Sequence, residues 1–353
     1  MFDSPFPPSD QFSQFAPEPP PERSRRALAL ALAAAGAIVL IVAAVWAISV
    51  FAIGPDTHNT PQTGGKTPEE AVRLYFDALA QDNPEKALSL GIDQPPNKEF
   101  LTADVLKRQQ DLAKISGAQV LGSAQGNGPD TANVSVSVMF GDVQSQDTLV
   151  VRKTPEGWKL PHAAIVLQPS TPTGGGRALE FLTLFGKPAG NVKAIAVFPG
   201  ALEVGSFNKN IALAPERDKE LLGQLYQGSD PNWLINGQLS QNGHDTIIQA
   251  LHDRLEACEQ STALVPQNCP NKLNNSQAAP DTAHWVETEN YDDQDPDVDL
   301  DFNSMTAKVT VTLHWTFSVQ LVSGGNGNGQ FPTEPRDFTG SVDLARDPLE
   351  VVF

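Results

Sequence analysis

Few residues of this 353-residue chain have the type and spacing that chemistry needs. The candidates are two cysteines, Cys258 and Cys269, and an acidic run at residues 295–301. The six histidines are scattered, and no nucleophile elbow, phosphate-binding loop, zinc-binding helix motif or dinucleotide fingerprint occurs. We therefore expect no catalytic residue, no cofactor-binding residue and no metal ligand, and we expect that the protein is not an enzyme.

The acidic run, DPDVDLD, fails as a calcium-binding loop. An EF-hand loop needs glycine at its sixth position and glutamate at its twelfth. Counting from Asp295 gives Leu300 and Thr306 at these positions. Because apolar and acidic residues alternate, the run instead predicts a strand at a solvated sheet edge. Its inward side chains would be those of Val298, Leu300 and Phe302.

Cys258 and Cys269 are the only cysteines. No histidine pattern accompanies them, so they make a poor zinc site. In an oxidising compartment, an even pair predicts one disulfide. The location of the chain therefore decides what these two thiols do.

Residues 27–53 form an apolar run without a charged side chain, directly after Arg23, Arg25 and Arg26. As a helix the run is about 40 Å long, enough to cross a hydrocarbon core of about 30 Å. The arginines place residues 1–26 in the cytoplasm and residues 54–353 outside. We expect a single-pass plasma-membrane protein with an extracytoplasmic C-terminal ectodomain. A cleaved signal peptide is the alternative, but its apolar region is normally shorter.

The proline-rich tail at residues 1–26 predicts disorder, either as a solvated tail or as a docking segment for a cytoplasmic partner. The chain carries a net charge of −18, with 42 acidic and 24 basic residues. Such a surface repels nucleic acid, which needs a basic stripe for binding. We therefore exclude nucleic acid as a partner.

After a polar linker at residues 54–65, residues 66–168 predict a first folded domain. Thr67 is a helix N-cap, followed by an apolar face and then by helices over residues 84–90 and 98–116. The first helix turns Tyr75 inward and Asp77 outward. The inward side chains of the third helix would be Phe100, Val105, Leu106 and Leu112. Strands are predicted over residues 132–140, 148–153 and 158–160 by their period-two pattern.

Two phrases of this domain, TPEEAVRLYFDALAQDNPEKALSL from Thr67 and EGWKL from Glu156, resemble the NTF2-like family. The resemblance implies a cone of helices against a curved antiparallel sheet. Enzymes of that family place an acid and a tyrosine inside the cone. Because Tyr75 and Asp77 lie on different faces of the predicted helix, we interpret Tyr75 as a core aromatic and Asp77 as a surface acid.

Residues 169–176 are rich in proline and glycine and predict a domain boundary. Residues 169–228 would form a linker and a small β module, and residues 229–353 a distal α+β domain. In the distal domain a helix is predicted from Asp245 to Cys258. Residues 255–270 resemble an actinobacterial envelope family of unknown function, in which a helix ending in cysteine precedes a Pro-x-x-Cys-Pro loop. The resemblance implies a Cys258–Cys269 disulfide.

Residues 305–321 alternate between apolar and polar along their whole length, which predicts a long strand with a bend or bulge. Asn303 and Ser304 could make a two-residue hairpin before it. Residues 323–329 predict a flexible loop, and residues 340–344 and 349–353 predict further strands. A helix packed on such a meander could be a second NTF2-like unit.

The expected fold class is therefore α+β: an NTF2-like helix-plus-curved-antiparallel-sheet domain after one transmembrane helix, followed by a disulfide-containing α+β distal domain. We expect a membrane-anchored cell-envelope protein with a non-catalytic ectodomain that binds an envelope protein or cell-wall partner or forms a scaffold. A small-molecule or lipid binder that uses the NTF2-like cavity is the alternative, and an enzyme ranks third. The oligomeric state stays open.

Overall fold

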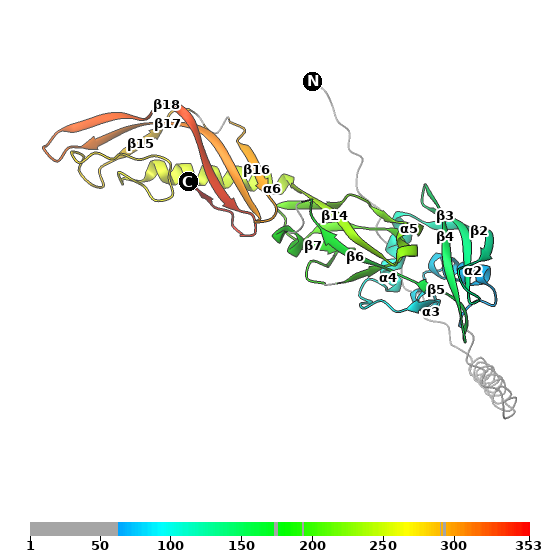
Figure 1. Cartoon of the computed structure of the whole chain (residues 1–353). Helices are drawn as coiled ribbons and strands as arrows, with labels where there is room; N and C mark the ends of the chain where they lie inside the picture. Colours follow the sequence, from blue (N-terminus) through cyan, green and yellow to red (C-terminus); the bar gives the residue numbers. More distant parts are fainter. Residues whose placement is uncertain (1–62, 173–175, 193, 290, 292–293) are drawn as a thin grey trace, which may run out of the picture. The chain divides into compact units, whose positions relative to one another are not determined.

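The computed structural model describes residues 63–172, 176–192, 194–289, 291 and 294–353 (Figure 1). The predicted tail at residues 1–26, the apolar run at 27–53 and most of the linker at 54–65 lie outside the described residues. No helix within the described part is long and apolar enough to cross a membrane. The described chain is a mixed α+β structure with curled sheets and one disulfide.

Three helices begin the described chain, as predicted: α2 (Pro68–Ala80), α3 (Pro84–Ser89) and α4 (Ala103–Leu112). The Thr67 hydroxyl caps α2 by accepting from the Glu70 N–H. Helix α4 is shorter than predicted, and its Leu112 is 54% exposed, so the prediction of an inward Leu112 is wrong. The helix ends at this residue, and Ala113 and Ile115 take the buried positions that follow.

The helices pack on a five-stranded sheet of order β1-β5-β4-β3-β2. Its strands are β1 (Gly91–Asp93), β2 (Ile115–Gln125), β3 (Thr131–Phe140), β4 (Val143–Thr154) and β5 (Gly157–His162). All neighbours are antiparallel except β1 and β5. Strand β2 was not predicted, because its exposed residues and two register shifts hide the period-two pattern. We call residues 63–164 the first module.

A middle module of short strands follows, in three small sheets of order β12-β14-β6-β9, β11-β7-β8 and β10-β13. Its elements are β6 (Ile165–Ser170), η1 (Arg177–Phe181), β7 (Leu182–Leu184), β8 (Lys187–Pro188), β9 (Ile195–Val197), β10 (Gly200–Ala201), β11 (Val204–Ser206), β12 (Ile211–Pro215), β13 (Lys219–Glu220), α5 (Leu222–Gln227) and β14 (Ser229–Leu239).

Strands β6 and β14 pair in parallel within this middle module. Strand β6 lies mostly inside the predicted first domain, and β14 lies inside the predicted distal domain. The predicted boundaries at residues 168 and 228 therefore do not separate the sheets. A parallel pair joins segments far apart in sequence, so no local pattern marks it.

The distal part consists of α6 (Gln241–Gln260) and a sheet of β15 (His284–Glu287), β16 (Asp297–Asp301), β17 (Thr306–Gln320), β18 (Asn326–Asp343) and β19 (Val351–Val352). The order is β15-β17-β18-β19, and β16 also pairs with β17. The long strand and its irregularity are confirmed, because the register of β17 against β18 shifts between Leu313 and Trp315. The predicted hairpin is longer than two residues, since the last pair is Asp301 with Thr306.

The predicted flexible loop at residues 323–329 is wrong from Asn326 onward, where β18 begins. Glycine and asparagine alternate here with the period of a strand. Phe317 explains Gly329, because a Cβ on this residue would lie 2.7 Å from the Cζ atom of the Phe317 ring. The predicted strand at residues 340–344 is the end of β18, and the final one is β19.

Candidate functional site

The interior of the first module is filled by its own side chains. Tyr75, Phe76, Phe100 and Phe140 are each at most 1% exposed. The Tyr75 hydroxyl donates to the Ala163 carbonyl oxygen at 2.8 Å, and burial raises the pKa of this phenol. Asp77 is exposed on the opposite side of α2. The tyrosine and the acid are therefore not brought together, and Tyr75 acts as a core residue.

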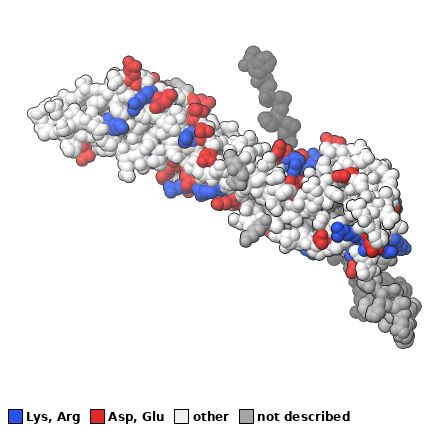
Figure 2. Space-filling view, viewed as in Figure 1, with Lys and Arg blue, Asp and Glu red and all other residues white. Residues whose placement is uncertain are grey.

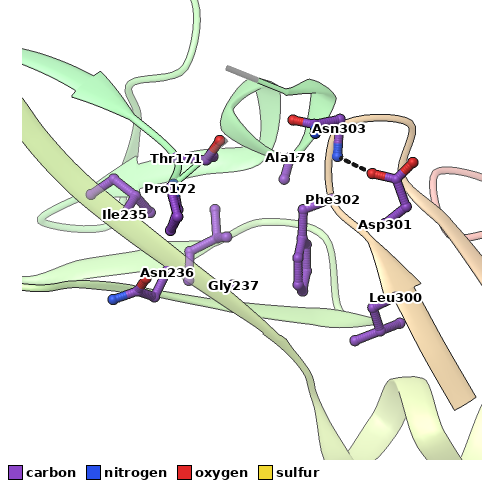
Figure 3. A pocket seen from close by; sticks show the side chains of 11 residues that line it. Thr171, Pro172, Ala178, Ile235, Asn236, Gly237, Leu300, Asp301, Phe302 and Asn303 are labelled. Atoms are coloured by element: carbon purple, nitrogen blue, oxygen red, sulfur yellow. Dashed lines mark hydrogen bonds between the residues drawn. The ribbon is translucent and has the colours of Figure 1, made fainter. Parts of the chain in front are cut away.

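A ligand-sized pocket lies instead where the turn after β16 meets the middle module (Figure 3). We call it the junction pocket, and its volume is about 330 Å³. Its lining residues are Thr171, Pro172, Ala178, Leu213, Ile235, Asn236, Gly237, Leu300, Asp301, Phe302 and Asn303. Ala178, Leu213 and Ile235 are buried and give the pocket an apolar floor.

The position of the Phe302 ring depends on the backbone around it. A Cβ on Gly237 would lie 2.7 Å from the Cε1 atom of this ring, so only glycine lets the ring pack on β14. The turn is also held by the backbone: the Ala178 N–H donates to the Phe302 carbonyl at 3.2 Å, and the Arg177 N–H to the Asn303 carbonyl at 3.1 Å. The wall of the pocket is thus built by two segments far apart in sequence.

The polar side chains of the junction pocket do not form a catalytic arrangement. The Asp301 carboxylate accepts from the Ser304 hydroxyl at 2.8 Å and from the Asn303 N–H at 2.9 Å, and these bonds lower its pKa. Asn236 is exposed at the rim. The lining residues include no histidine, cysteine, serine or lysine. The pocket can hold a small amphipathic molecule.

A buried acid pair lies elsewhere in the middle module, between the end of β13 and the start of β14. Glu220 is 0% and Asp230 5% exposed. Arg217 donates to the Asp230 carboxylate, which also accepts from the Asn232 N–H at 3.2 Å. No donor among the described residues reaches either carboxyl oxygen of Glu220. The pKa of Glu220 is raised to about 8, mainly by burial and then by the negative charge of Asp230. The positive charge of Arg217 acts in the opposite direction and reduces this rise.

Sequence reasoning missed this acid pair. Its two carboxyl groups come from different strands and ten residues apart, and no spacing marks them. Like charges at close range push two pKa values apart, and some enzymes use such a coupled pair as acid and base. The pair would also need access to substrate. Neither Glu220 nor Asp230 lines the junction pocket.

The outer face of the distal sheet carries a shallow hollow of about 410 Å³. Residues of the three neighbouring strands β15, β17 and β18 line it, and none of them is Asp, Glu, Lys or Arg. The lining residues are His284, Val286, Thr316, Phe317, Ser318, Asn328, Gly329 and Gln330. This surface offers hydrogen-bonding groups from His284, Thr316, Ser318, Asn328 and Gln330.

Cys258 and Cys269 form a disulfide with an S–S distance of 2.02 Å. Cys258 is buried at the end of α6. The segment that the bridge closes lies against the inner face of the distal sheet, where the Trp285 indole N–H donates to the Ala263 carbonyl at 3.1 Å. The disulfide therefore fixes the cover over Trp285.

The acidic run forms β16, with Asp297, Asp299 and Asp301 exposed and Val298 and Leu300 partly buried, as the alternation predicted. In the described part of the chain, no three His, Cys, Asp or Glu side chains gather in a way that could hold a metal ion. Compared with protein-family models, with curated proteins and with solved structures, the chain matches none.

Proposed function

We propose that this chain is a single-pass cell-envelope protein whose ectodomain is a non-catalytic module that binds an envelope partner or forms a scaffold. Residues 27–53 would be the membrane anchor, and residues 54–353 would face outward. The Cys258–Cys269 disulfide supports this orientation, because structural disulfides persist in oxidising compartments.

The filled interior of the first module carries the proposal. A binder or enzyme built on a cone of helices and sheet needs an internal cavity with convergent polar groups. Here Tyr75, Phe76, Phe100 and Phe140 occupy that space, and the one hydroxyl among them is already bonded to the Ala163 carbonyl. Recognition must then take place on the surface of the ectodomain.

We also propose that the first module is an NTF2-like domain. Three helices packed on a curved five-stranded sheet support this assignment, as does the position of the Gly-Trp-Lys phrase at the start of β5. The fold by itself fixes no activity, since one fold carries many functions. The membership in an actinobacterial envelope family rests on the sequence resemblance alone.

The orientation is tested by labelling. A Thr57→Cys variant of the full chain is treated in intact cells with a maleimide that does not cross membranes. We expect labelling as strong as in lysed cells, because residue 57 would lie just outside the membrane. Ser13→Cys, in the predicted cytoplasmic tail, is the matched control and should label only after lysis. The reverse pattern would overturn the proposed orientation.

The partner is tested by in-cell crosslinking and purification of the full chain with its anchor intact. We expect an envelope protein or a cell-wall component to co-purify. If no adduct forms in cells where the topology is as proposed, the recognition role is wrong.

A second candidate function follows from the junction pocket. Its apolar floor of Ala178, Leu213 and Ile235, with the exposed Asn236 amide at the rim, fits a small amphipathic molecule of the envelope. A ligand that binds only the folded state raises the melting temperature. Envelope lipid and glycan fragments are therefore screened against the wild type and Asn236→Trp, which would block the rim. A shift lost in this variant supports the pocket, whereas no shift with any fragment counts against it.

A further inference from the structure

The outer edge of β18 has three parts that differ in what protects them. Residues 341–342 pair with β19. Before them, residues 332–335 leave the ladder, because Leu313 pairs with Arg336 and Trp315 with Phe331. This excursion contains Pro332, Glu334 and Pro335. Residues 326–331, which we call the open edge, pair only with β17 within the described part of the chain.

Unpaired edges invite pairing with another chain, and proteins normally protect them with proline, charge or a bulge. The excursion combines all three devices. The open edge has none of them, and no Asp, Glu, Lys or Arg occurs between residues 315 and 333. Figure 2 shows the end of this hairpin without a charged side chain on the face in view. One strand is therefore protected along one half and left open along the other.

From this contrast we infer that two copies of the chain pair along their open edges, as an antiparallel extension of the distal sheet. The contact would be isologous, with the same surface on both copies. Centred on Asn328, it sets this residue opposite its own copy and Asn326 opposite Gln330. The three side chains are exposed. Each amide can both donate and accept, so it can bond to its counterpart.

Charge favours a second copy as the occupant. The whole chain carries −18, so most of its surfaces would repel a second copy. In the pairing centred on Asn328, residues 326–330 of the two copies lie opposite each other, and none of these residues is charged. No like charges therefore meet. The new strand would lie next to Gly329, which packs against the partly buried Phe317 ring on the inner face of the sheet.

The size of the contact decides where it can form. The five paired residues of each copy, 326–330, bury less area than the roughly 1,600 Å² of a standard interface, so the pairing of free ectodomains is weak. Copies held in one membrane meet at a much higher effective concentration. The test therefore uses the full chain in its own membrane.

Asn328→Cys places a thiol on the proposed two-fold axis, and the native cysteines do not interfere because they are bonded to each other. Thr339→Cys is the matched control, exposed on the same strand but beyond the excursion. After mild oxidation we expect a disulfide-linked dimer with Asn328→Cys and only monomer with Thr339→Cys. Equal crosslinking of both variants, or none, would overturn the proposal, as would an adduct of Asn328→Cys with a different protein.

A second variant tests the same contact without a new thiol. Asn328→Lys sets two like charges directly opposite each other, which destabilises a strand pair. In-cell chemical crosslinking of the full chain should then lose its dimer band, while Thr339→Lys keeps it. Thermal unfolding of both variants checks that each still folds. A folded Asn328→Lys variant that keeps the dimer band would contradict the proposal.

Discussion

The sheet of the first module and the distal sheet each have an apolar inner face, and different elements cover these two faces. In the first module, helix α2 covers the inner face and aromatic side chains close the interior. In the distal part, α6 covers only some of the inner face, and the segment closed by Cys258–Cys269 covers Trp285. The inner face of the first sheet is thus covered by a helix, whereas that of the distal sheet is covered in part by a segment that a disulfide holds. The distal sheet also keeps the open edge at residues 326–331. Because of this open edge, we propose the distal sheet as the recognition surface.

The largest expected effects come from removing one interior aromatic in each part. Phe100 is 0% and Trp285 1% exposed. Phe100→Ala and Trp285→Ala should each lower the free energy of unfolding by about 3–5 kcal/mol, through lost burial and a cavity. Denaturant unfolding measures this loss. If Trp285→Ala costs less than about 1 kcal/mol, the distal cover does not pack as described.

Removal of the disulfide should destabilise the distal part and leave the first module unaffected. Closing the 11-residue separation contributes about 3 kcal/mol in the chain-entropy model. Cys258→Ala/Cys269→Ala should lose about this amount. Hydrogen exchange should show the loss in β15 and β17 and not in α2. Equal loss of protection in both parts would break the comparison.

Between the two sheets, Glu220 is expected to give the stability a pH dependence. Its pKa is about 8 in the folded chain and 4.5 as the ordinary value, so the folded state holds a proton that the unfolded state has lost. The free energy of unfolding therefore falls as the pH rises from 4.5 to 8, by at most about 1.4 kcal/mol per unit.

Glu220→Gln should remove most of this slope and stabilise the protein above pH 8. Glu216→Gln, an exposed glutamate four residues earlier, is the control and should keep the slope. Urea unfolding at pH 5, 7 and 9 separates the two variants. A slope unchanged in Glu220→Gln would show that this carboxyl group does not titrate in the window.

The smallest effect is expected at Tyr75, whose hydroxyl is buried and bonded to the Ala163 carbonyl. Tyr75→Phe should cost about 1 kcal/mol, since it removes one hydrogen bond and leaves that carbonyl without its donor. A gain in affinity for a small molecule, measured by thermal shift, would instead show that the interior is accessible. Asp77→Asn, on the exposed side of α2, should change neither quantity.

Local patterns predicted much of the fold. The Thr67 cap, the apolar face with Tyr75 and the alternation along β17 are short-range features, and the structure contains them. The open edge was mistaken for a loop because glycine suggests a turn. Only the Phe317 ring, on the neighbouring strand, explains Gly329.

The candidate sites were predicted less well, because they depend on contacts between distant segments. The junction pocket needs the turn at Phe302 to lie on Gly237. The acid pair needs two strands to bring Glu220 and Asp230 together. The parallel pair of β6 and β14 that organises this region has no local pattern either. By contrast, the disulfide was predicted, since only two cysteines exist.

Site-specific photo-crosslinking in cells compares the two sheets most directly. A photoreactive residue replaces Gln330 in the distal sheet or Gln146 in β4, two exposed glutamines on sheet strands. The account predicts adducts of the full chain, with a second copy or an envelope component, from position 330 and not from position 146. Adducts from position 146 alone, or from neither position, would contradict the claim that the distal sheet is the recognition surface.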